Sequence, residues 1–328
     1  MILTVTLNPA LDVTYETDSL RRHGTHRVAT VAEHAGGKGV NVARVLHTLG
    51  APVRATGLAG GATGAHLRDL LGNAGIAEAF LPIAADTRRT VVVTDPAGAT
   101  GFWEPGPRVG AQEWAAFQAH YAGLLDGVKV VVLSGSLPAG VPADAYATLL
   151  SIAHAAGAAT ILDTDGEPLR NALRQRPGLV KPNTEELHSA TGLAVDTPAA
   201  AHAAASALRA LGARDVVASL GAAGLIGLYG TRTGQAKLPH PLTGNPTGAG
   251  DACVAALALG ELSDQPWPAR LADAVALSAA AVLAPVAGTI APEQFQRLRS
   301  QVQQADLDPT AGGGEQSPDR PGAPCAAR

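Results

Sequence analysis

The chain has 328 residues, of which 46% are hydrophobic and 16% charged, so it can bury a large core and is too apolar to be mainly disordered. A formal net charge of −4 at pH 7 lacks the basic excess of a nucleic-acid-binding domain, so we expect no nucleic-acid partner. The two cysteines, Cys253 and Cys325, form no CxxC or Cys/His cluster, which argues against a disulfide scaffold and a structural zinc site.

The sequence also argues against a membrane protein. Its start, MILTVTLNPALD, has no basic segment and reaches Asp12 before an apolar stretch of signal-peptide length is complete. Residues 274–292 carry no charge over a length that would span a bilayer. This stretch is mostly alanine and contains Ser278 and Pro285, so it predicts a buried helix ending near Pro285. We therefore expect a cytoplasmic protein without membrane contact.

Apolar strands alternate with helical stretches along the chain. The pattern predicts strands at 3–7, near Val53, at 128–133 and at 159–163, and helices at 38–49, 66–73, 111–125 and 143–156. In the first helix Val42, Leu46 and Leu49 share one face. Strand 128–133 (VKVVVL) is a continuous apolar run, as in strands covered on both faces. The fold class is therefore α/β, with a parallel sheet between two layers of helices.

Three regions depart from this alternation. Residues 13–33 and 87–104 are poor in helical patterns and rich in β-branched residues, which predicts extra strands that form either a lid over a site or ordinary surface hairpins. Residues 306–328 are rich in proline and glycine and predict a disordered tail after a body at 1–305.

The segment NPTGAGD (245–251) has the composition of a phosphate site. Gly248, Ala249 and Gly250 lead into a helical stretch with Asp251 in its first turn. A helix N-terminus offers free N–H groups and the positive end of the dipole, and small residues let a phosphate approach the backbone. The alternative is that Asp251 is simply a helix cap.

Two further segments are ambiguous on their own. AGGKGVNVAR (35–44) fits neither a Walker A loop nor a dinucleotide fingerprint, and Gly36 and Gly37 would also suit a tight turn. Lys38 and Asn41 are three residues apart and would face the same polar ligand. In VKPNTEEL (180–187), Asn183 and Glu186 fit a capping box at least as well as a metal-related pair.

The order of the motifs is more specific than any single one. TLNPALD, AGGKGVNVAR, SGSLP (134–138), LVKPNTEEL, SLGAAG (219–224) and PTGAGD together resemble the ribokinase-like (PfkB) carbohydrate kinase family. Within that family the chain is most similar to the branch of 1-phosphofructokinase and tagatose-6-phosphate kinase. The resemblance runs from the start to about residue 300. It implies a three-layer α/β/α fold with a mostly parallel sheet and a small β lid.

The resemblance also implies roles for individual residues. Asp251 matches the catalytic base, and the backbone N–H groups of Gly248, Ala249, Gly250 and Asp251 match the anion hole. Asn183 and Glu186 match an NxxE element that organises magnesium, with Glu186 acting through water. Residues matching the nucleotide site are Ser219, Gly221 and Gly224, and residues matching the sugar site are Asp12, Gly36, Gly37, Lys38 and Asn41.

A phosphorylated acceptor is implied by cationic positions. Arg88, Arg27 and Lys38 match positions that neutralise a sugar phosphate in this branch, and Ser136 lies near the same pocket in relatives. The alternative for Arg88 and its neighbour is a solvated strand edge. Thr90, Gly101 and Trp103 stand where the branch usually has polar Asn, Glu and Asn, which leaves the exact sugar open.

The sequence therefore predicts a kinase that uses ATP and Mg²⁺ to phosphorylate a hexose phosphate. Fructose 1-phosphate is the leading acceptor, followed by tagatose 6-phosphate and fructose 6-phosphate. Other hypotheses are a kinase for an unphosphorylated sugar or nucleoside, a non-catalytic sugar-phosphate sensor and, last, an NAD-dependent enzyme. We also expect a homodimer formed through the lid, and a cleft that joins Asp251 to the Lys38–Asn41 turn.

Overall fold

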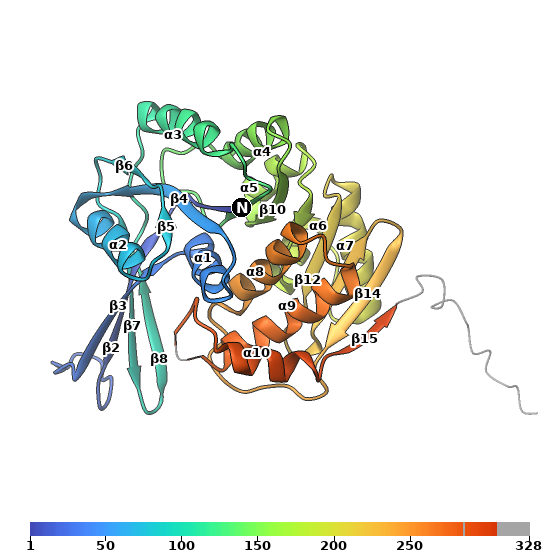
Figure 1. Ribbon diagram of the computed structural model, residues 1–328. Coiled ribbons are helices and arrows are strands. Elements are labelled where there is room, and N and C mark those ends of the chain that lie inside the picture. The colour runs from blue at the N-terminus through green and yellow to red at the C-terminus, as the bar shows by residue number, and fades with distance from the viewer. Residues whose placement is uncertain (285, 307–328) are drawn as a thin grey trace, which may run out of the picture.

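The computed structural model describes residues 1–284 and 286–306 and is built around one large sheet (Figure 1). Its strands are β1 (Ile2–Thr6), β4 (Val53–Gly60), β5 (Ala77–Glu78), β6 (Leu81–Ile83), β9 (Val130–Ser134), β10 (Ala159–Asp163), β11 (Leu179–Val180), β12 (Asp215–Ser219), β13 (Leu225–Tyr229), β14 (Arg232–Lys237) and β15 (Gln303–Asp306). All residues of β1 and β9 are buried, as expected of strands covered on both faces.

The strand order is β15-β14-β13-β12-β11-β10-β9-β1-β4-β5, with β6 also pairing with β4. Pairing is parallel from β5 to β12 and antiparallel from β12 to β15. Because the parallel strands run in the same direction, their carboxyl ends meet at one edge of the sheet. Ligands of open α/β sheets bind at this edge.

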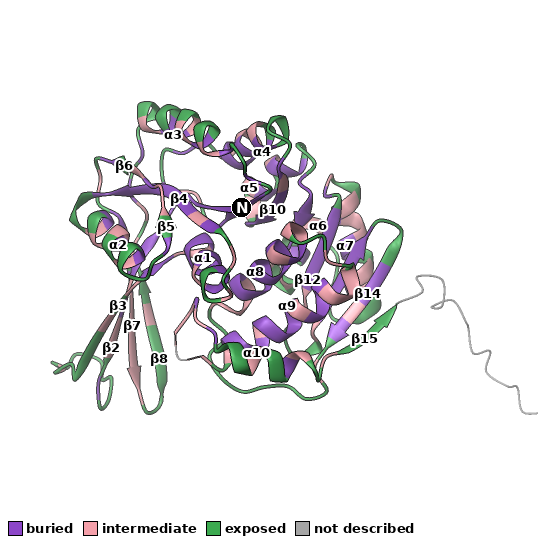
Figure 2. Ribbon diagram, viewed as in Figure 1, coloured by how far each residue is buried: buried purple, intermediate pink, exposed green. Residues whose placement is uncertain are grey.

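Helices cover both faces of the sheet. They are α1 (Lys38–Thr48), α2 (Gly61–Asn73), α3 (Ala111–Leu124), α4 (Ala145–Ala155), α5 (Gly166–Leu173), α6 (Thr184–Thr191), α7 (Pro198–Ala210), α8 (Ala249–Leu262), α9 (Trp267–Val282) and α10 (Pro292–Arg299), with a 3₁₀ turn η1 (Gly221–Ala223). One hydrophobic core lies beneath α1, α8 and α9, and a second beneath α3, α4 and α7. Figure 2 shows the central strands buried and exposed residues on the outer helix surfaces, the loops and the four-stranded sheet. The predicted three-layer α/β fold is confirmed.

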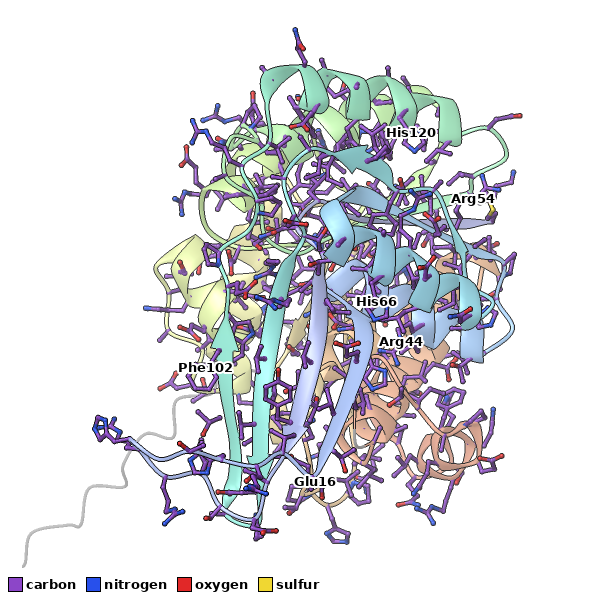
Figure 3. The ribbon with its side chains drawn as sticks, turned by 90° about the vertical axis from the view of Figure 1, so that its left-hand side faces the viewer. Glu16, Arg44, Arg54, His66, Phe102 and His120 are labelled. Carbon is purple, nitrogen blue, oxygen red and sulfur yellow. The ribbon has the colours of Figure 1, made fainter. Side chains whose placement is uncertain are left out.

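A second, four-stranded sheet is built from the two helix-poor regions. It has the order β3 (Thr30–Gly36), β2 (Ala10–Glu16), β7 (Arg88–Asp95) and β8 (Gly98–Trp103). In the register, Asp12 on β2 lies between His34 on β3 and Thr90 on β7. Figure 3 shows the four strands side by side, with Phe102 on the outer strand β8.

The predicted elements appear with small shifts. Strand 159–163 is exact, and helix 66–73 begins earlier, at Gly61. Residues 274–282 of the uncharged stretch form the second half of the buried helix α9, which ends before Pro285. No helix within the described ranges is both long and apolar enough to cross a bilayer. Apart from Asp306, which belongs to β15, the predicted tail lies outside the described residues.

Candidate active site

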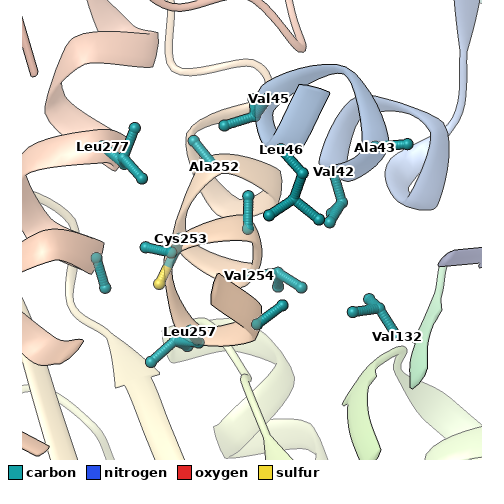
Figure 4. Packing of buried hydrophobic residues seen from close by; sticks show 14 of the residues in the cluster. Val42, Ala43, Val45, Leu46, Val132, Ala252, Cys253, Val254, Leu257 and Leu277 are labelled. Carbon is teal, nitrogen blue, oxygen red and sulfur yellow. The ribbon is translucent and has the colours of Figure 1, made fainter. Parts of the chain in front are cut away.

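Two buried helices bring the AGGKGVNVAR and PTGAGD motifs together. Val42 and Leu46 of α1 belong to the same core cluster as Val254 and Leu257 of α8, and the two helices pack against each other (Figure 4). At the start of these helices the Nδ2 of Asn41 donates a hydrogen bond to Oδ2 of Asp251 over 2.8 Å. The expected proximity of Asp251 to the Lys38–Asn41 turn is therefore present.

Asp251 lies in an environment that favours its neutral form. The side chain is buried, and this burial, together with the carboxylate of Asp163, raises its pKa from 3.8 to about 7. The hydrogen bond from Asn41 and the charges of Lys38 and Lys181 act in the opposite direction. A carboxyl group with a pKa near neutrality is matched to general-base chemistry.

Four charged side chains form a network beside Asp251. Nζ of Lys38 lies 3.5 Å from Oδ1 of Asp163 and 3.5 Å from Oε1 of Glu186, and Nζ of the buried Lys181 lies 3.6 Å from the same Asp163 oxygen. Burial alone would lower the pKa of Lys38, but the neighbouring carboxylates raise it above its usual value. The site thus holds two permanent cations next to its carboxylates.

Sequence reasoning missed Asp163 and Lys181. Asp163 is the last residue of β10, where an acidic residue closes an otherwise apolar strand at the carboxyl edge of the sheet. Lys181 follows β11 and comes directly before Pro182 within the motif that supplied Asn183 and Glu186. The signal for both residues was their place at the ends of predicted strands.

The N-terminus of α8 has free backbone donors. Gly248 caps the helix with φ +85°, and a Cβ at this position would lie 3.0 Å from Cα of Ala287. Within the described residues the N–H groups of Gly248, Gly250 and Asp251 have no backbone acceptor, whereas that of Ala249 donates to the carbonyl of Pro246 over 3.2 Å. Three of the four expected amides can therefore receive an anion.

The NxxE element forms the capping box that its spacing predicted. Oδ1 of Asn183 accepts a hydrogen bond from the Glu186 N–H (2.8 Å), and Oε2 of Glu186 accepts one from the Asn183 N–H (2.9 Å). The other oxygen of Glu186 faces Lys38, so one carboxylate both caps α6 and reaches the charged network.

The predicted nucleotide residues lie on the neighbouring strand ends. Ser219 ends β12 and forms a bridge with Asn183. Gly221 and Gly224 flank the 3₁₀ turn with φ of +58° and +89°. A Cβ on Gly224 would lie 2.2 Å from the carbonyl oxygen of Ala236, so this turn requires glycine.

A cavity of about 160 Å³ opens between the two sheets. It is lined by Thr6, Asn8, Lys38, Arg88, Gly135, Ser136, Thr164 and Asp165. Nη2 of Arg88 donates to the carbonyl of Asn8 (3.2 Å), and Nδ2 of Asn8 donates to Oγ of Ser136 (3.1 Å). Nε of Arg88 and Oδ1 of Asn8 are buried without a partner among the described residues. Such atoms are normally satisfied by a ligand or water.

Asp12 lies in the second sheet, on β2, beside the strand β7 that carries Arg88. Burial raises its pKa to about 6, against the opposing effects of Thr90, Arg88 and Arg44. A Cβ on Gly36 would lie 2.0 Å from the Asp12 carboxyl, so Gly36 leaves the space that this carboxyl occupies. A Cβ on Gly37, at φ +105°, would meet Thr6.

Arg27 is the one predicted site residue that lies apart from the others. It is exposed in the segment that connects β2 and β3, and it does not line the cavity. Within the described residues no group of three or more His, Cys, Asp or Glu side chains has the arrangement of a metal site.

A family model described as pfkB family carbohydrate kinase matches residues 6–294. The chain belongs to the pfkB family. The phosphofructokinase-2 of Escherichia coli, solved in complex with potassium, is 30% identical over 91% of this chain and 98% of that one, with a TM-score of 0.86. This pfkB protein is thus a sugar phosphotransferase with a phosphofructokinase-like fold.

Two more distant structures share the fold alone. A protein from Thermotoga maritima described as a possible 1-phosphofructokinase is 24% identical, with a TM-score of 0.82 over 94% of this chain and 99% of that one. The ribokinase of Arabidopsis thaliana, complexed with ribose and ATP, is 22% identical, with a TM-score of 0.73 over 91% of this chain and 98% of that one.

Proposed function

We propose that this pfkB kinase transfers the terminal phosphate of ATP to a primary hydroxyl of a hexose phosphate, with fructose 1-phosphate as the leading acceptor and fructose 1,6-bisphosphate as its product. The observation that carries the proposal is the cationic cavity. Lys38 and Arg88 both line it, and Nε of Arg88 has no partner among the described residues. Guanidinium and ammonium groups in a cavity suit a phosphate better than a neutral sugar.

Fructose 6-phosphate is the second candidate acceptor. The Escherichia coli phosphofructokinase-2, at 30% identity, has been solved in complex with fructose-6-phosphate. Both fructose phosphates carry one dianionic group and one free primary hydroxyl, so the same cation pair would serve either. Tagatose 6-phosphate differs from fructose 6-phosphate only in one epimeric hydroxyl.

Asp251 would accept the proton of the attacking hydroxyl. Its Oδ2 is held by Asn41, which leaves Oδ1 to face the acceptor, and its pKa near 7 allows both proton uptake and release near neutral pH. The sugar hydroxyls would be held by Asp12 and by the Gly37–Lys38 turn. Arg88, Lys38 and Ser136 would bind the phosphate that the sugar already carries.

The free amides of Gly248, Gly250 and Asp251 fit the phosphate chain of a nucleotide. Ser219, Gly221 and Gly224 would border the rest of that nucleotide. ATP supplies the transferable phosphoryl group, and Mg²⁺ neutralises the charge on its phosphates. Since the described residues offer no dedicated metal cluster, Glu186 would contact the ion through water, with phosphate oxygens as the other ligands. Preorganised donors of this kind supply most of the stabilisation in phosphoryl transfer.

The test is a coupled ADP-release assay with fructose 1-phosphate, fructose 6-phosphate, tagatose 6-phosphate, fructose and adenosine. We expect the highest kcat/KM with fructose 1-phosphate, and at least a 100-fold lower kcat for Asp251→Asn, the low end for a general base. Preference for fructose or adenosine would refute a phosphorylated acceptor. Binding of a sugar phosphate without turnover of any acceptor would favour the sensor hypothesis.

The same proposal extends to assembly. The Escherichia coli phosphofructokinase-2 has been solved as an inhibited tetramer. The sheet of β3, β2, β7 and β8 exposes Val31, Phe102 and Trp103, which supports a homodimer formed through this sheet.

A further inference from the structure

Arg44 connects α1 to a segment more than two hundred residues away. Its Nη1 donates a hydrogen bond to the carbonyl oxygen of Ala287 over 3.0 Å. Arg44 is half-buried, and its side chain also lines a cavity of about 80 Å³ with His34 and Leu71. Figure 3 shows Arg44 close to the four-stranded sheet. A partly buried arginine that binds a distant backbone carbonyl restrains that backbone.

The restrained segment supports the N-terminus of α8. A Cβ added to Gly248 would lie 3.0 Å from Cα of Ala287 and 3.0 Å from the backbone nitrogen of Gly288. The turn formed by residues 287 and 288 therefore packs directly on Gly248, the first of the three residues whose N–H groups are free. A shift of this turn would let the first turn of α8 move.

The same turn also packs on Asn41. A Cβ on Gly288 would lie 2.7 Å from Oδ1 of Asn41, the residue that donates to Asp251. Asn41 and Arg44 are three residues apart in α1, so they lie on the same side of the helix. One face of α1 thus makes two contacts: Asn41 holds Asp251, and Arg44 holds the 287–288 turn that supports the α8 amides.

We propose that Arg44 is a positioning residue for phosphoryl transfer: by holding the carbonyl of Ala287 it keeps the 287–288 turn on Gly248 and Asn41, and so keeps the α8 amides aligned with Asp251. This inference rests on the proposed roles of Asp251 and the amides. Because catalytic geometry tolerates little displacement, loss of such a restraint affects turnover more than ground-state binding.

The test compares the wild type with Arg44→Met, Arg44→Lys and the control Arg68→Met in the ADP-release assay. Methionine keeps an apolar stem but no donor, and lysine keeps a donor and the charge. We expect kcat to fall at least about 10-fold for Arg44→Met, with less than about a 3-fold change in KM for ATP. Arg44→Lys should recover most of kcat. Arg68 forms its ion pair with Glu78, between α2 and β5, so its variant should retain wild-type kcat.

The outcomes separate this inference from the proposed function. An inactive wild type would refute the proposed function itself. If the wild type is active, Asp251→Asn is inactive and Arg44→Met has a normal kcat, only the role of Arg44 is overturned. The same holds if Arg44→Met lowers the melting temperature but keeps the wild-type kcat. If Arg44→Met does not fold, Gly288→Ala tests the same turn from its other side, and an unchanged kcat for that variant would overturn the inference.

Discussion

Asp251 combines burial with a pKa near 7, and this pairing has consequences for both activity and stability. A general base must be ionised, so we predict that kcat rises with pH through about 7. Because the folded-state pKa is raised above 3.8, the native state binds more protons than the unfolded state between about pH 4 and 7. The free energy of unfolding therefore loses a contribution as pH rises through this window, and the loss is complete above pH 7.

Asp251→Asn provides the check, because asparagine mimics the neutral acid. Relative to the wild type, the melting temperature of the variant should rise between pH 5 and pH 8, as measured by calorimetry. If the difference in melting temperature between the two proteins is constant across this range, the Asp251 carboxyl has its ordinary pKa. That result would remove the argument that Asp251 is a base with a pKa near neutral pH.

Arg88 and Arg89 are adjacent and have opposite environments. Arg88 lines the cavity, whereas Arg89 is exposed and paired with Glu104 over 2.9 Å. Since hydrogen bonds to charged groups contribute about 1.5–3 kcal/mol, we predict that Arg88→Ala raises the KM for the sugar phosphate about 10- to 100-fold and that for ATP much less. Arg89→Ala is the matched control and should leave both values near wild type. Equal effects of Arg88→Ala on the two substrates would place it outside the acceptor site.

The sequence predicted several of the residues that meet at the candidate site but not their electrostatics. Motif order and family resemblance identified Asp251, Asn41, Lys38 and Glu186. Nothing in the spacing showed that Asp163 and Lys181, from two other strands, would meet beside them. Such contacts depend on strand order, which a single sequence does not determine.

At the scale of elements, the N-terminus of α8 depends on one glycine. Gly248 has φ +85° and touches the 287–288 turn, so Gly248→Ala would add both backbone strain and a steric conflict. The left-handed conformation alone costs about 1–2 kcal/mol for a non-glycine residue. We predict a lower melting temperature and a loss of kcat. Gly72→Ala, within α2 and with open space around it, should leave kcat unchanged and stabilise the protein by up to about 1 kcal/mol. A fully active Gly248→Ala variant would contradict the role of this turn.

Helices and strands were predicted well where the repeat of apolar residues was long, and less well where glycine interrupted that repeat. Helix 111–125 and strand 159–163 match the structure to within one residue, whereas the strand predicted at 128–133 begins two residues later, at Val130. The first turn of α2, GATG, reads as a loop, but Gly64 packs within van der Waals distance of Ala59 and Thr87, where a larger residue would not fit. Tertiary packing therefore decides the start of this helix.

At the scale of the whole molecule, the two sheets have different roles. The large sheet is covered on both faces and carries the strand ends of the site. The four-stranded sheet carries Asp12 and Arg88, which we propose bind the acceptor. Its outer strand β8 is largely exposed, and its other outer strand, β3, is exposed toward its start. An exposed strand edge can pair with another chain, and exposed apolar side chains that gather in a patch mark interaction sites.

We predict that the protein is a dimer of 33.0 kDa subunits joined through this sheet. Trp103 is 70% exposed, and Phe102 and Val31 are each 56% exposed. A two-fold interface at this sheet would bring the same strands of each copy together and remove exposed apolar side chains from water. The double variant Phe102→Ser/Trp103→Ser should therefore shift the mass measured by light scattering from dimer to monomer. Leu211→Ser, at the end of α7 and 52% exposed in the wild type, is the control and should leave the mass unchanged. A wild-type protein that is monomeric at all concentrations, or a double variant that stays dimeric, would exclude an interface at this sheet.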